Sequence, residues 1–111
     1  MNLLGLIVGG LLRENLRDPQ KARRLVGVRG DVLIRADRMR VTLRVRDGDV
    51  RILRGEPGPA DAHVEGTFGA LLHVALGRGL FAPALRGEVA AGGRVGLILR
   101  LLPLLRVADG G

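Results

Sequence analysis

The strongest constraint on the fold is a pair of alternating runs joined by Asp47-Gly48. Apolar and polar residues alternate from Val41 to Arg46, which is the period of a strand with one buried face. Val50 and Ile52 resume the apolar positions after the turn. Because glycine adopts positive φ without steric cost, Asp-Gly between two such runs is a strong hairpin signal. The pattern therefore predicts two antiparallel strands that bury the same face.

Three further segments complete the predicted sheet. Residues 28–34 alternate like a strand, and residues 62–65 and 85–89 form two shorter strand-like runs. Residues 56–59 must form a loop, because two prolines around a glycine cannot continue a strand ladder. The sequence thus predicts an α+β domain built on an antiparallel sheet of about five strands.

Two helices are predicted to cover the apolar face of this sheet. Thr67 is a suitable N-cap for a helix over residues 67–77, in which apolar residues recur at helical spacing. A second helix over residues 94–106 is unusually apolar for a helix that covers a core. Pro103 should kink or end this second helix near Leu102.

The N-terminal segment is predicted to be helical as well. Residues 3–12 are apolar on all sides, yet as a helix they would extend only about 15 Å, about half of a bilayer core. We expect this helix to pack on the domain or on another subunit, in preference to dipping into a membrane. Asp18 and Pro19 favour a short second helix that ends at Gly27.

At 111 residues the chain has room for one domain. We divide it into an N-terminal helical lead over residues 1–27, the domain itself over residues 28–107, and a disordered tail over residues 108–111. The absence of cysteine rules out disulfides and thiolate metal sites, so it gives no indication of the redox compartment.

The composition excludes the commonest kinds of covalent catalysis. The chain contains no Ser, Cys, Tyr or Trp, so Thr42 and Thr67 are its only hydroxyl groups. His63 and His73 stand ten residues apart, a spacing that fits no paired metal ligands. No glycine-rich phosphate loop is present. We therefore expect no catalytic residue, no metal site and no cofactor, and this expectation favours a binding role.

Basic residues give the chain a formal net charge of +7. Lys21 is the only lysine among the 18 basic residues, a skew that bacterial coding bias explains better than many separate arginine contacts. The simplest interpretation of the strand arginines is a solvated face, and the functional alternative is attraction to an anionic membrane. Nucleic-acid binding is disfavoured, because neither Phe68 nor Phe81 lies at an outward strand position. The arginines expected on this outward face are Arg29, Arg35, Arg44, Arg46, Arg51 and Arg86.

The order of motifs along the chain is distinctive. After the hairpin come an acidic, Pro/Gly-rich link, Ala60-Asp61-Ala62-His63-Val64, Leu71-Leu72 and Gly77-Arg78-Gly79. The chain then continues with Leu85-Arg86-Gly87-Glu88-Val89, Gly92-Gly93 and the last apolar helix. Over residues 28–105 this order resembles the sterol carrier protein 2 domain family. Asp18-Pro19 to Gly30 also resembles the lead-in of the bacterial ubiquinone-biosynthesis accessory branch.

The resemblance implies non-catalytic binding of a hydrophobic lipid between sheet and helices, with transfer or presentation of that lipid. An acyl chain, a sterol-like molecule or a polyprenyl-quinone intermediate would each be compatible. The residues themselves favour a cavity, because only two are aromatic and the covering helices are rich in Gly, Ala and Leu, which makes dense filling harder. The residues expected to line the cavity are Leu43, Val45, Ile52, Leu72, Leu76, Ile98 and Leu102.

Two other interpretations remain open on the sequence. The first is a small interaction module that forms a homodimer or docks a partner through residues 3–12 and 97–105. The second is a protein that binds the surface of an anionic membrane through the same segments. The second apolar face of residues 94–106 would line a lipid tunnel, pack on residues 3–12, dimerise or rest on a membrane. We expect a cytoplasmic protein, with peripheral contact at the inner membrane under the last interpretation.

Overall fold

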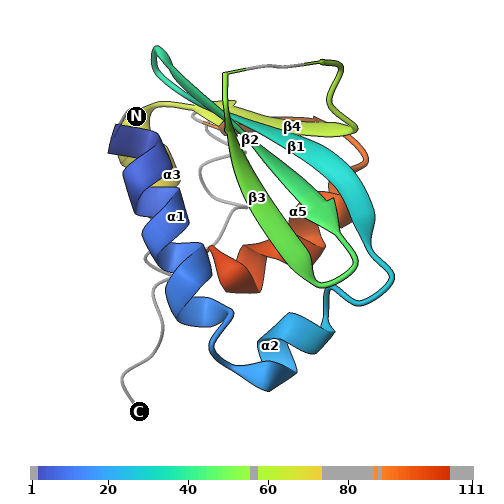
Figure 1. Ribbon diagram of the computed structural model, residues 1–111. Helices are drawn as coiled ribbons and strands as arrows, with labels where there is room; N and C mark the ends of the chain where they lie inside the picture. Colours follow the sequence, from blue (N-terminus) through green and yellow to red (C-terminus); the bar gives the residue numbers. More distant parts are fainter. Residues whose placement is uncertain (1–2, 56–57, 74–86, 88, 106–111) are drawn as a thin grey trace.

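A five-stranded sheet carries the helices on one of its faces (Figure 1). The computed structural model describes residues 3–55, 58–73, 87 and 89–105. Across the sheet the strands lie in the order β3-β2-β1-β4-β5. The α+β class and a sheet of five strands, both expected from the sequence, are confirmed, but the last strand, predicted over residues 85–89, is found at Val89–Gly93. The strands are β1 (Arg29–Ala36), β2 (Met39–Arg46), β3 (Asp49–Arg54), β4 (Ala62–Gly66) and β5 (Val89–Gly93).

One strand pair departs from the predicted antiparallel arrangement, so the sheet is mixed. β1 and β4 run parallel, with Val32 beside Ala62 and Ile34 beside Val64. The other three pairs are antiparallel. The reason is that the chain leaves β3 at one edge and crosses beyond β2 and β1 before β4 begins, instead of turning back in a hairpin. Alternation identifies the two faces of a strand, but it does not fix the strand's direction.

The hairpin at Asp47-Gly48 is confirmed as the turn between β2 and β3. Both residues have positive φ, +47° at Asp47 and +92° at Gly48. The Asp47 carboxylate also accepts a hydrogen bond of 2.6 Å from the Gly27 N–H. This contact ties the turn to the segment that enters β1. The predicted turn before β2 is present as well, with Asp37 at φ +55°.

Charged side chains occupy the face of the sheet that turns away from the helices. On this face Asp31 accepts from Arg44 Nε at 3.2 Å and lies 3.4 Å from Arg46 Nη1. Arg35 and Glu65 approach to 3.7 Å across the parallel pair. On this face arginines therefore pair with acidic residues of neighbouring strands. Each such exposed pair contributes little to stability.

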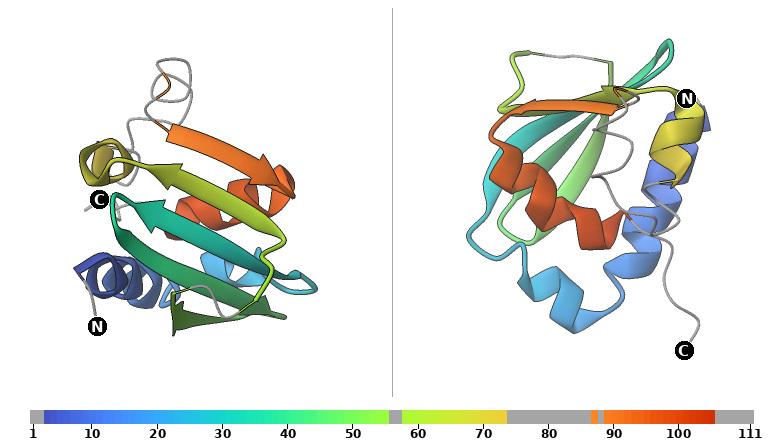
Figure 2. Two further views of the ribbon diagram at one scale, coloured as in Figure 1. Left: turned by 90° about the horizontal axis from the view of Figure 1, so that it is seen from above. Right: turned by 180° about the vertical axis from the view of Figure 1, so that it is seen from behind.

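The helices lie together on the other side of the sheet, as the view from behind shows (Figure 2). α1 packs against β2 and β3 and buries Leu4, Val8 and Leu12, which share one side because they are spaced by four residues. The prediction that residues 3–12 pack on the domain is confirmed. Among the described residues, none of the helices has the length and hydropathy that crossing a bilayer requires. The helices are α1 (Leu3–Asn15), α2 (Pro19–Arg23), α3 (Phe68–His73), α5 (Val95–Leu101) and the 3-10 turn η2 (Leu102–Leu104).

Local signals set several helix ends where the sequence places them, but α2 ends at Arg23, earlier than the predicted end at Gly27. Asp18 caps α2 by accepting the Gln20 N–H at 2.9 Å, and Thr67 Oγ1 accepts the Ala70 N–H at 3.1 Å. α5 ends before Pro103, which lies in η2, so the predicted effect of this proline is confirmed. The predicted helix over residues 67–77 begins as expected, but its last four residues lie outside the described part of the chain.

Candidate functional site

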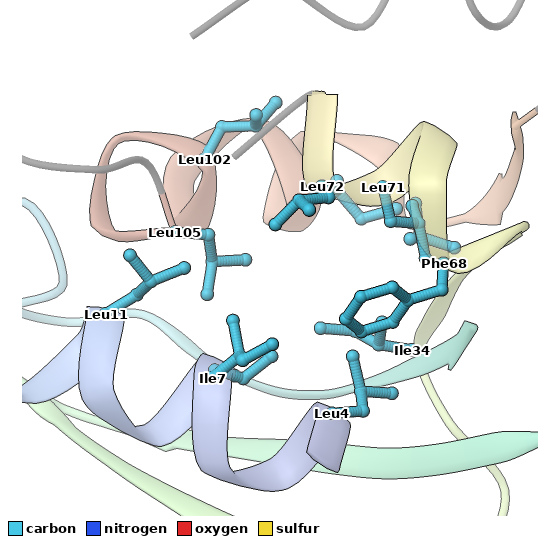
Figure 3. A pocket seen from close by; sticks show the side chains of 12 residues that line it. Leu4, Ile7, Leu11, Ile34, Phe68, Leu71, Leu72, Leu102 and Leu105 are labelled. Carbon is cyan, nitrogen blue, oxygen red and sulfur yellow. The ribbon is translucent and has the colours of Figure 1, made fainter. Parts of the chain in front are cut away.

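An apolar cavity of about 90 Å³ lies between the helices and the sheet (Figure 3). Its walls come from α1, α3, the C-terminal helical segment and two central strands. Every described side chain on these walls is aliphatic or aromatic. They are Leu4, Ile7, Val8, Leu11, Ile34, Val64, Phe68, Leu71, Leu72, Ile98, Leu102 and Leu105.

α1 supplies one complete wall. Leu4, Ile7, Val8 and Leu11 follow the i, i+3, i+4, i+7 spacing that places side chains on one side of a helix. In Figure 3 the labelled members of this set, Leu4, Ile7 and Leu11, project from α1 toward the side chains of the opposite walls. Leu4 and Val8 are buried, whereas Ile7 and Leu11 are half-buried at the cavity.

The sheet and α3 form the next two walls. Ile34 and Val64 are direct neighbours in the parallel pair, so both point to the same face. Phe68, Leu71 and Leu72 stand above them at i, i+3, i+4 spacing on α3. A hydrogen bond of 3.2 Å from the Phe68 N–H to the Asp37 carboxylate attaches the start of α3 to the end of β1. The turn after β1 thereby positions Phe68 over the sheet.

The C-terminal wall is held by a polar contact inside the core. Ile98, Leu102 and Leu105 reach the cavity from α5 and η2. Asn15, at the end of α1, is only 1% exposed and donates from Nδ2 to the Leu104 carbonyl at 2.8 Å. Its side-chain oxygen accepts from Lys21 Nζ at 2.8 Å. This amide therefore fixes η2 against α1, and with it the distance between two walls of the cavity.

The chemistry available in the cavity is limited to apolar contact. None of the described wall residues carries a side-chain donor, acceptor or charge, so a ligand there would be held by burial and dispersion. The volume is small beside the roughly 300–1,000 Å³ of typical ligand pockets. A chain-like ligand would have to displace wall side chains, and Leu72, at 37% exposure, is the most exposed of them.

The residues predicted to line the cavity lie in different parts of the structure. Leu72, Ile98 and Leu102 lie on its walls. Leu43 and Val45 do not, because other core side chains enclose them completely on the central strand β2. In this structure the two positions belong to the packed core, and their contact with a lipid stays a prediction.

Ile52 and Leu76 complete the predicted set. Ile52 lies near the edge of the sheet, 37% exposed, in a separate groove between α1 and β3. There its side chain packs against the helix backbone at Gly9, where an added Cβ would stand 3.1 Å from Ile52 Cδ1. Ile52 therefore does not line this cavity, and its contact with a lipid stays a prediction. Leu76 lies outside the described residues.

The wall formed by α1 was not predicted from the sequence. The spacing of Leu4, Ile7, Val8 and Leu11 is visible in the sequence, but Leu3, Leu6 and Leu12 fill the remaining directions around the helix. A helix that is apolar all round shows no preferred face. Only the position of α1 against the sheet selects the four residues that meet the cavity.

Several solved structures share the architecture of this chain. No protein-family model matches the sequence, and no curated protein matches it significantly. The ubiquinone synthesis protein UbiJ-SCP2 superposes with a TM-score of 0.71 at 19% identity, covering 94% of this chain and 96% of its own. The sterol carrier protein domain 2 of Helicoverpa armigera gives a TM-score of 0.68 at 13% identity, covering 92% and 88%.

This chain has the sterol carrier protein 2 fold. The resemblance stated from the sequence motifs is therefore confirmed at the level of the fold. The sterol carrier protein 2 fold also occurs inside a larger protein, the stereoselective inverting sec-alkylsulfatase Pisa1 from Pseudomonas sp.. That match has a TM-score of 0.68 at 23% identity and covers 83% of this chain but 15% of the sulfatase.

Proposed function

We propose that this protein binds a hydrophobic lipid, without catalysis, in the cavity between α1, α3, the C-terminal helical segment and the sheet. The observation that carries the proposal is a wall on which every described side chain is apolar, placed between sheet and helices. Several proteins with the same fold are sterol carrier proteins. The ligand class is an acyl chain, a sterol-like molecule or a polyprenyl-quinone intermediate, for transfer or presentation.

Burial alone supplies the driving force for such a ligand. Each methylene that leaves water contributes about 0.8 kcal/mol, so a few methylenes outweigh modest rearrangement of side chains. The half-buried wall residues Ile7, Leu11 and Leu102 can change rotamer without breaking a hydrogen bond. We therefore expect a bound lipid to enlarge the cavity beyond its 90 Å³.

A non-catalytic role is part of the proposal. The chain has no Ser, Cys or Tyr, and the described cavity wall offers no group that could transfer a proton or attack a substrate. The alkylsulfatase match indicates that the same fold can form one part of an enzyme. We propose carriage or presentation rather than turnover, at a cytoplasmic location with contact to the inner membrane.

The competing interaction module has a specific surface to use. Leu4, Val8 and other residues of the two apolar segments, 3–12 and 97–105, are buried in the core of the domain and cannot contact a partner. Leu3 and Leu6 remain 54% and 59% exposed on α1, and Leu99 is 57% exposed on α5. Sedimentation over a range of protein concentrations tests this alternative, because a protein that stays monomeric throughout lacks the homodimer interface.

The first test is native mass spectrometry of the freshly purified protein, followed by organic extraction and identification of any lipid. A discrete adduct of defined stoichiometry supports the proposal and names the lipid class. Protein that is lipid-free and takes up neither fatty acid nor isoprenoid after incubation contradicts it.

A pair of neighbouring substitutions on α1 tests the location of the ligand. Ile7→Arg places a charge in the cavity wall, whereas Leu6→Arg places the same charge on an exposed position outside it. Because a buried unpaired charge is strongly unfavourable, we expect Ile7→Arg to weaken binding of a fluorescent fatty acid roughly tenfold or more. Leu6→Arg should bind as the wild type does.

Leu72→Arg serves as the second wall variant, since its partial exposure favours correct folding. Circular dichroism establishes that each variant is folded before binding is compared. Folded Ile7→Arg and Leu72→Arg proteins that bind the fatty acid with wild-type affinity would place the ligand elsewhere.

A further inference from the structure

A second concave surface lies on the opposite side of α5 from the cavity. It is a groove between α5 and the segment that links α2 to β1, and we call it the arginine groove. In the view from behind, α5 lies over the sheet with this linking segment beside its first turn (Figure 2). The residues that line the groove are Val26, Gly27, Val28, Arg29, Arg94, Gly96, Leu97 and Arg100.

The groove is cationic because both segments that form it lack acidic residues. No Asp or Glu occurs between Pro19 and Gly30 or between Val89 and Val107. Arg29, Arg94 and Arg100 are all exposed, and among the described residues none of the three pairs with a carboxylate. Arg94 instead donates from Nη1 to the Arg29 carbonyl at 3.1 Å, so these two residues are held together.

The carboxylates nearest to the groove already have other partners. Asp47 accepts the Gly27 N–H at 2.6 Å, and Asp61 accepts the Asp31 N–H at 2.8 Å. Asp31 itself faces Arg44 and Arg46. Among the described residues no carboxylate forms an ion pair with Arg29, Arg94 or Arg100, so their exposed guanidinium groups can meet an external anion.

Exposed apolar side chains border the arginines. Val26 is 66% exposed beside the groove, and Val95 and Leu99 are 41% and 57% exposed on α5. Successive residues of an α-helix are rotated by about 100° about its axis. One side of α5 carries the groove residues Gly96 and Arg100, and the other side faces the cavity. Val95 and Leu99 lie between these two sides. Arginines flanking exposed aliphatic side chains match a bilayer surface, which offers anionic headgroups above an apolar layer.

We propose that the arginine groove and the exposed face of α5 dock the protein on an anionic lipid bilayer. This inference goes beyond lipid binding in the cavity and stands without it. If both hold, α5 serves as a shared wall, with Ile98 on the cavity side and Arg100 on the bilayer side. Nucleic acid is the other polyanion, but no aromatic residue lies among the described groove residues to stack on bases.

The test is co-sedimentation with phosphatidylcholine vesicles that contain or lack phosphatidylglycerol. We expect the wild type to bind only the anionic vesicles at low salt. Binding should fall steeply as ionic strength rises from about 0.01 M to about 1 M, since the Debye length shrinks from roughly 30 Å to roughly 3 Å. Arg100→Glu should weaken binding roughly tenfold or more, because it replaces attraction by repulsion.

Arg38→Glu is the matched control. It makes the same change in net charge at an exposed position in the turn after β1, at the other end of that strand from Arg29. Equal losses for Arg38→Glu and Arg100→Glu would overturn the proposal, since net charge alone would then explain binding. Leu99→Asp is a second test variant, on the exposed face of α5 beside the groove. It too should reduce binding to anionic vesicles.

Two further outcomes would overturn the proposal. One is a wild type that ignores anionic vesicles at low salt, and the other is a wild type that binds a single-stranded oligonucleotide in preference to them. Uptake of a soluble fluorescent fatty acid is measured on Arg100→Glu without vesicles. Uptake reports on the cavity alone, so a failure of the lipid-binding proposal and a failure of the docking proposal are distinguished.

Discussion

At the scale of single residues, one buried amide joins the two ends of the chain. Asn15 is only 1% exposed, and its Nδ2 reaches the carbonyls of Leu11 at 2.9 Å and Leu104 at 2.8 Å. Lys21 Nζ satisfies the amide oxygen at 2.8 Å. Because the contact is buried, the Leu104 carbonyl would lose its side-chain donor if the amide were removed. A polar residue thus sets the spacing between two apolar walls.

Substitution of this amide should be costly. We expect Asn15→Ala to lower the free energy of unfolding by about 2 kcal/mol, since the Leu104 carbonyl is left buried without its donor. Urea denaturation measures the change, with the exposed neighbouring variant Gln20→Ala as control. An Asn15→Ala protein as stable as Gln20→Ala would show that the contact is dispensable.

At the scale of elements, two consecutive glycines, Gly92 and Gly93, form the end of the edge strand β5. β5 pairs with β4 at the edge, and Gly93 adopts φ +72° where the chain turns into α5. A Cβ at Gly93 would collide with the backbone of Asp61 and Ala62. The Arg94 N–H donates to the Asp61 carbonyl at 2.8 Å at the same point. The position of α5 therefore depends on a close approach of two backbones.

Gly93→Ala should disturb this junction. We expect a loss of about 1–3 kcal/mol in the free energy of unfolding, because both the positive φ and the backbone contact resist a side chain. Gly96→Ala is the matched control inside α5, where an added Cβ meets nothing within 4 Å. The control should gain up to about 1 kcal/mol from helix propensity. Equal stability of the two variants in thermal denaturation would refute the argument.

At the scale of the whole molecule, helices from both ends of the chain enclose one side of a mixed sheet. α1 and η2 are far apart in the sequence, yet they lie side by side and share a core with β1 and β2. The cavity lies where these packed elements leave space beside α3. Because its apolar walls lack partner atoms across that space, filling it should stabilise the entire fold.

Ligand binding should therefore raise the melting temperature. A fatty acid present at about 100 times its Kd would add about 2.7 kcal/mol to the free energy of unfolding. For a domain of this size that corresponds to a rise of roughly 10 °C, measured by differential scanning calorimetry. Ile7→Arg should lose the rise while Leu6→Arg keeps it. A wild-type melting temperature that does not respond to the fatty acid would contradict lipid binding in the cavity.

Local structure could be predicted from the sequence because its causes lie within a few residues. Asp47-Gly48 makes the turn through backbone sterics, Thr67 caps α3 through its own hydroxyl, and Pro103 ends α5 because it lacks an N–H. The α+β class followed from such signals together with the two periodicities, 2 for strands and 3.6 for helices. Leu72, Ile98 and Leu102, predicted from the sequence to line a cavity, do lie on its walls, and their contact with a lipid stays a prediction.

Only the tertiary structure decided the arrangement of these pieces. The parallel direction of β4 arises from a crossover that no local pattern encodes. On α1, Ile7 faces the cavity and Leu6 faces outward, although both are large and apolar, because neighbouring elements select the side of the helix that is buried. Leu43 is enclosed while Ile34 reaches the cavity for the same reason. Hydrophobic burial is non-directional, so sequence determines which residues seek the interior, and packing between distant elements determines where each one lies.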